Sequence, residues 1–213
     1  AMERCAHRRA QPVAASAGAA PRAAGARRRI RLHRNLPSLP AATSPGWKGK
    51  ASKKVDWNGA VTAAKGTDGV TEALLRHEGS IGYVSYDRVQ KQRLAAVALK
   101  NADGQFALPS ERSIQAAVRG SGLVDNPFAS LLNARGADAW PIAELTYVLI
   151  PSDAQRAAAA GPTLQLFAWA LQKGDAIVRQ TGFVALPMLV QASAFKTLLS
   201  VRGADGKMLS VKL

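Results

Sequence analysis

The chain contains very little cysteine and histidine, and it has no long apolar run. Cys5 is the only cysteine among 213 residues, which excludes a disulfide framework. With only three histidines, of which His7 and His33 lie near the N-terminus, neither a metal cluster nor a Cys–His catalytic pair can be assembled. No run of about 18 apolar residues occurs, so no membrane-spanning helix is expected. We therefore expect no cofactor, no metal and no insertion into a membrane.

Acidic residues are also scarce, with 14 Asp and Glu against 29 Lys and Arg, which gives a net charge of +15. Over half of this excess lies in the first 36 residues, which carry +8 and contain Glu3 as their only acid. The segment has no aromatic residue and no apolar periodicity, so we expect residues 1–43 to be a disordered, basic, Arg/Ala-rich head. Its arginines are Arg4, Arg8, Arg9, Arg22, Arg27, Arg28, Arg29, Arg31 and Arg34.

Three origins could explain this head. Clustered arginines bind phosphate groups, so it could be an arm of a nucleic-acid-associated protein. It could be a targeting segment, although residues 13–20 form a poor apolar core for a secretory signal. We favour a third origin, in which the head is translated from the wrong reading frame. An Arg/Ala/Pro-rich sequence without structural periodicity is typical of a GC-rich gene translated out of frame. Reading the other two frames of the gene upstream of Ser44 tests this interpretation.

From residue 44 onward the sequence alternates strand and helix patterns, as an α/β protein does. Its apolar content, 47% over the whole chain, is enough for a core. Ser110 is expected to cap a helix that carries Ile114, Ala117 and Val118 on one side. Residues 145–150 are apolar on both faces, as in a strand buried inside a sheet. The sequence also predicts strands at 81–86, 95–100 and 106–108, a helical turn through Arg93, and helices at 70–76, 126–134, 161–173, 175–180 and 187–201.

Two glycine loops and the scattered acids give no catalytic pattern. Residues 65–70 could offer backbone N–H groups to an anion, but they lack the Walker ending, and we interpret them as a turn into a helix with Asp68 near its positive end. Residues 79–83 are interpreted as a tight turn that leads into a strand. His77 is the only histidine after the head, and the tryptophans are not interleaved with basic residues as a base-stacking platform would be. Alone, these residues predict a soluble α/β body that is not an enzyme.

Four segments in order carry a family resemblance: Gly46-Trp47-Lys48-Gly49-Lys50, Lys65-Gly66-Thr67-Asp68-Gly69-Val70, Gly79-Ser80-Ile81-Gly82-Tyr83-Val84-Ser85-Tyr86, and Asp138-Ala139-Trp140-Pro141-Ile142 followed by residues 146–150. Smaller matches are residues 102–104, 109–110, 167–170, 173–174, 185–187 and 205–207. Together they resemble the C-terminal half of the periplasmic phosphate-binding protein, the solute-binding subunit of the phosphate ABC importer. The resemblance covers about residues 44–213.

The resemblance implies a two-lobe, clamshell-type (type II) binding fold, here incomplete at its N-terminus. Members of the family grip phosphate with backbone and hydroxyl donors, a helix N-terminus, an Arg, and an Asp that accepts a proton from the ligand. Residues 44–143 would be the C-terminal part of lobe two, and residues 144–213 the crossover strand and the helices returning to lobe one. The implied partners are inorganic phosphate and the importer's membrane subunits. We expect a periplasmic monomer that binds no nucleic acid.

The chain departs from the family at the phosphate site. The family motif Arg-x-Asp-Gly-Ser-Gly-Thr should fall near residues 26–32, where this chain has Ala-Arg-Arg-Arg-Ile-Arg-Leu. The donors of lobe one would lie upstream of any segment that matches here. We therefore assign no catalytic residue and no phosphate ligand. Because both lobes would be partial, residues 145–150 are expected to be exposed, and the chain alone is expected to melt without cooperativity or aggregate, without binding phosphate.

Overall fold

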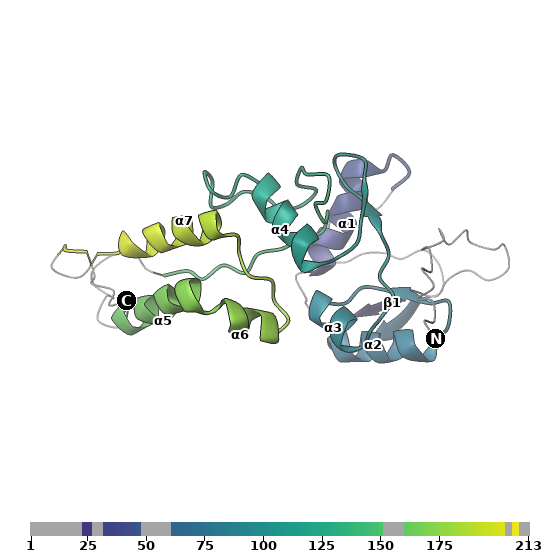
Figure 1. Ribbon diagram of the computed structural model, residues 1–213. Coiled ribbons are helices and arrows are strands. Elements are labelled where there is room, and N and C mark those ends of the chain that lie inside the picture. The colour runs from purple at the N-terminus through teal and green to yellow at the C-terminus, as the bar shows by residue number, and fades with distance from the viewer. Residues whose placement is uncertain (1–22, 27–31, 48–60, 151–159, 203–205, 209–213) are drawn as a thin grey trace, which may run out of the picture.

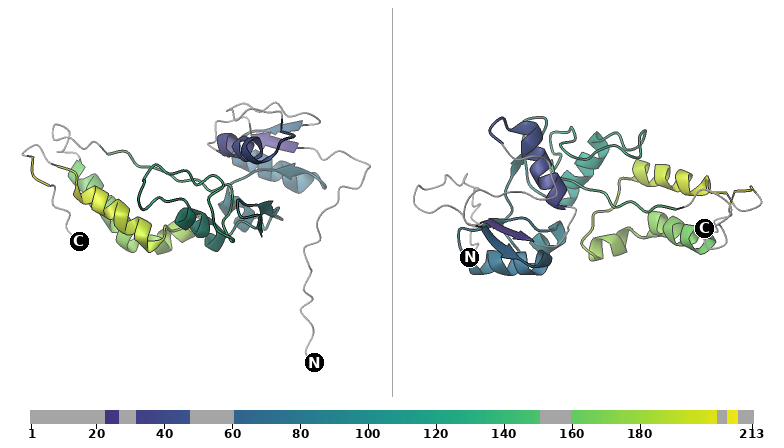
Figure 2. Two further views of the ribbon diagram at one scale, coloured as in Figure 1. Left: turned by 90° about the horizontal axis from the view of Figure 1, so that it is seen from above. Right: turned by 180° about the vertical axis from the view of Figure 1, so that it is seen from behind.

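The computed structural model describes residues 23–26, 32–47, 61–150, 160–202 and 206–208. In Figure 1 these residues form an elongated arrangement of two parts. One part contains a parallel sheet and the helices around it, and the other consists of helices within residues 160–200, which we call the helical arm. The views from above and from behind show the same separation (Figure 2).

A three-stranded parallel sheet lies in the first part. Its strands are β1 (Ala23–Ala26), β2 (Val61–Ala64) and β3 (Ile81–Gly82), with β1 in the middle. Ala23 lies opposite Val61 on one side and Ile81 on the other. Parallel strands need a crossover to reverse the chain. Helix α1 (Leu32–Thr43) follows β1, and helix α2 (Gly66–Arg76) follows β2.

The prediction that the head lacks regular structure is wrong for two segments, because β1 and α1 both fall within residues 1–43. β1 consists of Ala and Gly, so it has no apolar alternation by which a strand is recognised, and pairing on both sides provides its backbone hydrogen bonds. α1 contains Pro37 and Pro40, which lack a backbone donor, yet Leu39 is buried there. Tertiary packing therefore overrides a weak helix propensity. Residues 1–22 and 27–31 lie outside the described residues.

Helix α2 packs against β1 and β2 and buries Val70 and Thr71. Val70 is fully buried among Ala64, Ala73, Leu74 and Val84. The helix predicted at 70–76 is confirmed, and it begins one turn earlier. Its first residue, Gly66, has φ +68°, a left-handed conformation that glycine adopts without strain. After β3, the short helix α3 (Tyr86–Lys91) confirms the predicted helical turn.

A β-hairpin and a capped helix follow. Strands β4 (Leu99–Lys100) and β5 (Phe106–Ala107) pair antiparallel around the predicted turn. Helix α4 (Glu111–Gly120) begins with a reciprocal cap. The hydroxyl of Ser110 accepts a hydrogen bond from the Ser113 backbone N–H at 3.1 Å, and the Ser113 hydroxyl accepts one from the Ser110 N–H at 2.9 Å. The prediction that Ser110 caps this helix is confirmed.

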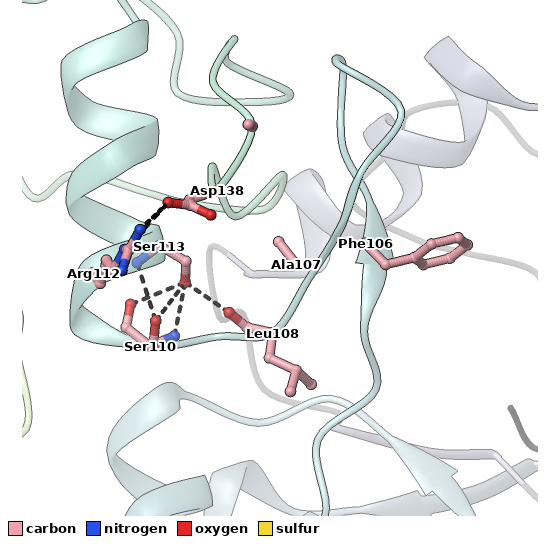
Figure 3. Close-up of a pocket in the computed structure, with 8 residues that line it drawn as sticks. Phe106, Ala107, Leu108, Ser110, Arg112, Ser113 and Asp138 are labelled. Atoms are coloured by element: carbon pink, nitrogen blue, oxygen red, sulfur yellow. Dashed lines mark hydrogen bonds and ion pairs between the residues drawn. The ribbon is translucent and has the colours of Figure 1, made fainter. Parts of the chain in front are cut away.

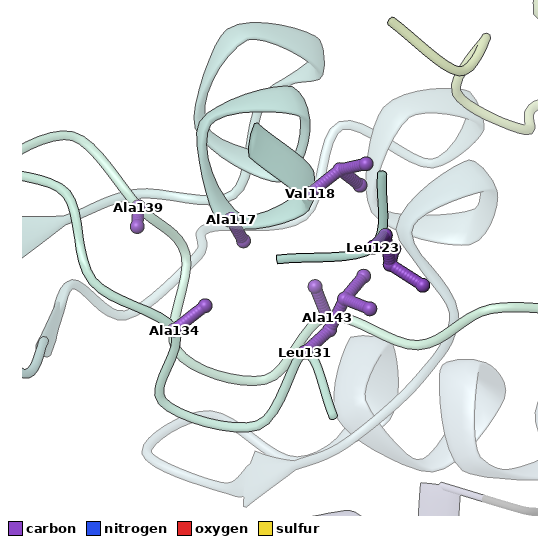
Figure 4. Close-up of a cluster of buried hydrophobic side chains, with 7 residues drawn as sticks. All are labelled: Ala117, Val118, Leu123, Leu131, Ala134, Ala139 and Ala143. Carbon is purple, nitrogen blue, oxygen red and sulfur yellow. The ribbon is translucent and has the colours of Figure 1, made fainter. Parts of the chain in front are cut away.

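The main core of the described residues lies beside α4 (Figure 4). Ala117 and Val118 of the helix pack against apolar side chains from the loops that follow it. Ile114, the third residue of the predicted apolar face, packs against the edge of this cluster. We call it the α4 cluster; its buried members are Ala117, Val118, Leu123, Leu131, Ala134, Ala139 and Ala143.

The helical arm contains α5 (Ala160–Lys173), α6 (Asp175–Gln180) and α7 (Met188–Leu199). These bounds confirm the three helices predicted in this region. α5 and α7 lie side by side in Figure 1 and contact one another. Leu164 and Val201 form a small buried cluster, with Ile150 and Leu198 packed against it. No residue of α7 itself is buried.

The arm meets the first part of the molecule through a few contacts. The amide of Gln115 donates to the carbonyl oxygen of Ala185 at 3.0 Å, and Arg179 Nε donates to Glu111 Oε1 at 2.9 Å. Leu186 and Val190 pack against the α4 cluster. Gly182, with φ +85°, lies against Asp87 of α3; a Cβ at this position would fall 2.2 Å from the Asp87 Cβ.

Four predicted elements differ from the structure. Residues 126–134 form turns rather than a helix, and residues 145–150 form no strand. The strand predicted at 81–86 is shorter in the structure. β3 ends at Gly82, and Tyr86, the last residue of the predicted strand, is the first residue of α3. Of the strand predicted at 95–100, only Leu99–Lys100 pairs. The expectation that residues 145–150 are exposed is confirmed for Tyr147, Val148 and Leu149.

Candidate functional site

The carboxyl edge of the parallel sheet is the first place to look for a ligand, because open α/β sheets bind ligands beyond the carboxyl ends of their strands. β1 and β2 end at the same level, with Ala26 opposite Ala64. The chain continues from β2 into Lys65 and α2, and from β1 into Arg27–Arg29. The three arginines lie outside the described residues, so the structure does not place their side chains.

The N-terminus of α2 has backbone donors with no side-chain cap. Lys65 is the N-cap residue, and its side chain makes no capping hydrogen bond. Free N–H groups at a helix N-terminus favour an anion. The chain supplies one itself, because Asp68 lies in the first turn and pairs with Arg88 at 2.9 Å. The interpretation of residues 65–70 as a turn into a helix, with Asp68 near its positive end, is confirmed.

Asp87 lies between the N-terminus of α2 and the arm, because it is close to Arg88, the partner of Asp68, and it contacts Gly182. It accepts a hydrogen bond from the Ser85 hydroxyl and lies 3.5 Å from Lys91 Nζ and 3.7 Å from Arg88 Nε. Burial alone raises the pKa of the carboxyl, but the Ser85 hydrogen bond and the charges of Lys91 and Arg88 outweigh it, so the pKa lies below its ordinary value. Asp87 is therefore a paired anion, not a base available to a substrate.

A second candidate is the open pocket beside the start of α4 (Figure 3). Phe106 and Leu108 lie at its apolar side, and both are exposed. Arg112 donates to Asp138 Oδ2 at 2.6 and 3.2 Å, and the Ser113 hydroxyl donates to the Leu108 carbonyl oxygen at 2.7 Å. These polar groups are thus occupied with one another. The pocket presents a structural ion pair and a helix cap rather than groups directed at a ligand.

Hydrogen bonds beside this pocket join the hairpin turn, residues 101–104, to residues 136–139, and both stretches overlap segments that carried the family resemblance. Asn101 is buried, and its amide donates to the carbonyl oxygens of Gly136, Ala137 and Ala139 at 2.9 to 3.2 Å. Asp103, from the matching turn, accepts a hydrogen bond from the Gly136 N–H at 2.9 Å. The hairpin turn and residues 136–139 are locked together, so these segments are structural.

The described residues contain no group of three or more His, Cys, Asp or Glu placed to hold a metal ion. His77 is the C-cap residue of α2 and is exposed, and its side chain has no acid or nucleophile bonded to it among the described residues. None of the helices in the described ranges has the length and apolar character needed to cross a membrane.

No family model matches the chain, but several curated proteins do. It is 32% identical to the phosphate-binding protein PstS of Xylella fastidiosa over 157 residues, which are 72% of this chain and 43% of that protein. It is 27% identical to PstS of Pasteurella multocida over 190 residues, covering 79% of this chain and 54% of the relative. The resemblance to the phosphate-binding protein family is confirmed. The chain spans about half or less of the length of these relatives.

A solved structure supports the fold. The crystal structure of a DING protein superposes with a TM-score of 0.59 at 18% identity, covering 90% of this chain and 61% of that one. This likeness places the chain in the same α/β binding-protein fold, of which it forms a part. Residues 1–43 make up a fifth of the chain, so a match that covers 90% of it extends into the head. The head therefore contributes to the shared fold through β1 and α1.

Proposed function

We propose that the chain provides the C-terminal part of a phosphate-binding protein that captures inorganic phosphate for ABC-type import. The observation that supports this most strongly is the identity to PstS over 157 residues, about three quarters of the chain. The described residues hold paired charges and helix caps but no nucleophile–base pair, which favours binding over catalysis. The importer's membrane subunits and a periplasmic location, with the protein as a monomer, belong to the same proposal.

The described residues do not by themselves form a phosphate site. Phosphate selectivity needs several donors around the oxyanion and an acceptor for its proton. At the carboxyl edge of the sheet, α2 offers uncapped N–H groups, but Asp68 adds negative charge there. Arg27–Arg29 follow β1 and would add positive charge at this edge, but their setting does not match the family motif. We assign no phosphate ligand to this chain and expect the chain alone to bind no phosphate.

A chimera tests the proposal. In the Xylella fastidiosa relative, the region matched by this chain is replaced by residues 44–213, so that the relative supplies its own remaining ligands. We expect the chimera to bind inorganic phosphate and its melting temperature to rise with millimolar phosphate, as ligand binding to the folded state requires. The parent relative is the positive control. A chimera that melts cooperatively but ignores phosphate, while the parent responds, would contradict the proposal.

The alternative, a nucleic-acid-associated protein acting through its basic head, is favoured by the nine arginines in residues 1–36. Deleting residues 1–43 is a poor test, because it also removes the central strand β1. Replacing Arg4, Arg8, Arg9 and Arg22 with Gln leaves β1 intact. DNA affinity that falls steeply with salt in the unchanged chain and drops in this variant would support the alternative.

A further inference from the structure

Arg179, close to the end of α6, joins the helical arm to α4. Its Nε donates to Oε1 of Glu111 at 2.9 Å, and Glu111 is the first residue of α4. Its Nη2 lies 3.8 Å from Oδ2 of Asp175, one turn earlier on α6. One guanidinium group therefore contacts a carboxylate of the arm and a carboxylate of the first part of the molecule.

Each of the two carboxylates is held in place by its own element. Asp175 accepts a hydrogen bond from the amide of Gln191 on α7 at 2.7 Å, which fixes it within the arm. Glu111 lies in the first turn of α4, where the positive end of the helix favours an acid. Because both carboxylates contact the same guanidinium group, they are close enough to repel one another when no positive charge lies between them. Arg179 supplies that charge at every ordinary pH.

Contacts of a different kind lie beside these charges. Gln115, one turn after Glu111 on α4, donates to the carbonyl oxygen of Ala185, which is buried, and Leu186 packs against the α4 cluster. In Figure 1, α6 lies at the end of the arm that faces α3. A neutral hydrogen bond and an apolar contact depend little on ionic strength, whereas salt screens an exposed ion pair. The charged part of this contact can therefore be separated from the rest by experiment.

We infer that Arg179 is a positioning residue, which holds the helical arm against α4 by placing its positive charge between Glu111 and Asp175. Without this charge the same helices bring one carboxylate toward another, and the contact loosens. The side chains of Arg179 and Glu111 are 49% and 42% exposed, so the effect is modest and the hold on the arm weakens as ionic strength rises. This role does not depend on the proposed function, because neither the contact nor its test involves phosphate.

Thiol labelling of the full chain measures how often the contact opens. Cys5→Ser removes the native thiol, and Ala185→Cys then places a single thiol at the contact, where the native side chain is 3% exposed. A buried thiol reacts only in the open state, so its labelling rate follows the opening equilibrium. Ala168→Cys is the matched control. Ala168 is fully buried on α5 within the arm, so a thiol there reacts only when the arm itself unfolds.

Charge variants are then compared by the labelling rate at the contact. Glu111→Gln removes the attraction and should raise the rate about threefold, whereas Arg179→Gln leaves two carboxylates facing one another and should raise it about tenfold. Adding Glu111→Gln to Arg179→Gln removes the repulsion and should bring the rate back to about threefold. The same substitution thus opens the contact in one background and closes it in the other, which a loss of packing would not do. Arg112→Gln, which breaks the ion pair with Asp138 inside the first part, should change the rate by less than about twofold.

Ionic strength gives a second readout. Raising sodium chloride from about 0.02 M to about 1 M should speed labelling in the chain with its native charges and slow it in Arg179→Gln, because salt screens an attraction in the first and a repulsion in the second. Three results would overturn the inference. These are a labelling rate of Ala185→Cys that ignores both charge changes, a double variant that opens more than Arg179→Gln alone, or an equal acceleration at Ala168→Cys, which would mean that the arm unfolds.

Discussion

The region around α4 and the helical arm contain similar proportions of apolar residues, yet they bury them very differently. Around α4, seven apolar residues are buried in one cluster, and the amide of the buried Asn101 donates to the carbonyl oxygens of Gly136 and Ala137. On the arm, α7 buries none of its residues, and α5 buries mainly Leu164 and Ala168. The α4 region closes its core with its own loops, whereas the arm has apolar surface that the described residues do not cover.

The largest effect that would test this contrast comes from adding one methyl group to a glycine in each region. A Cβ on Gly120 would lie 1.8 Å from the Arg135 carbonyl oxygen, so Gly120→Ala should destabilise the α4 region by about 3 kcal/mol. On the arm, Gly161 has no atom within 4 Å of such a Cβ, so Gly161→Ala should stabilise α5 by about 0.5–1 kcal/mol. Native-state hydrogen exchange gives the local opening free energies, and equal effects would contradict the contrast.

The next effect concerns the buried amide that holds the α4 region together. Asn101→Ala leaves the carbonyl oxygens of Gly136, Ala137 and Ala139 without their donor, which should cost about 2–3 kcal/mol. Gln172→Ala changes an exposed amide on α5 and should alter stability by less than about 0.5 kcal/mol. Amide exchange should accelerate in α4 and at residues 136–139 for the first variant only. Unchanged exchange there would show that the amide is replaceable.

A smaller effect is expected where the arm meets α3. Gly182→Ala combines a left-handed φ of +85° with a Cβ 2.2 Å from that of Asp87, so it should cost about 2 kcal/mol. Gly79→Ala is the matched control, because it shares a positive φ, +74°, but meets no atom within 4 Å, and should cost about 1 kcal/mol. The difference isolates the contact. If both variants lose the same stability, Gly182 does not couple the arm to α3.

The smallest effect is a dependence on pH at this same contact. Because the folded-state pKa of Asp87 lies below its ordinary value of 3.8, ionised Asp87 stabilises the fold above that pH, and this stabilisation is lost as pH falls through the folded-state pKa. Asp87→Asn should flatten the acid limb of a stability profile measured below pH 4. Asp125→Asn changes an exposed carboxylate outside this cluster and should leave the limb in place. An unchanged limb in Asp87→Asn would assign the acid sensitivity to other groups.

Local chemistry explains which helices could be predicted from the sequence. Ser110 has a recognisable capping pattern, and α6 has the predicted bounds, 175–180. The helix predicted at 126–134 fails because polar side chains bind nearby backbone instead. Asn126 Oδ1 accepts from the Phe128 N–H at 3.0 Å, and Ser130 Oγ accepts from the Leu132 N–H at 3.2 Å. Such bonds compete with the helical ladder.

Strands were harder to predict, because a strand depends on partners that are often distant in sequence. β1 is Ala-Ala-Gly-Ala and has no pattern of its own, but it pairs on both sides. Residues 145–150 have a clear strand pattern, yet they find no partner among the described residues. At the candidate site, the family segments correctly predicted the fold, but their roles as turns, caps and buried hydrogen bonds required coordinates.

The middle position of β1 has a consequence for the order in which the sheet can assemble. Among the described residues, β2 and β3 each pair with β1 and not with one another. During synthesis β1 emerges first and must wait for residues 61–64 before its first pairing becomes possible. β1 is thus the strand around which the described sheet forms, and a nascent chain halted before residue 61 exposes β1 without either of its described neighbours.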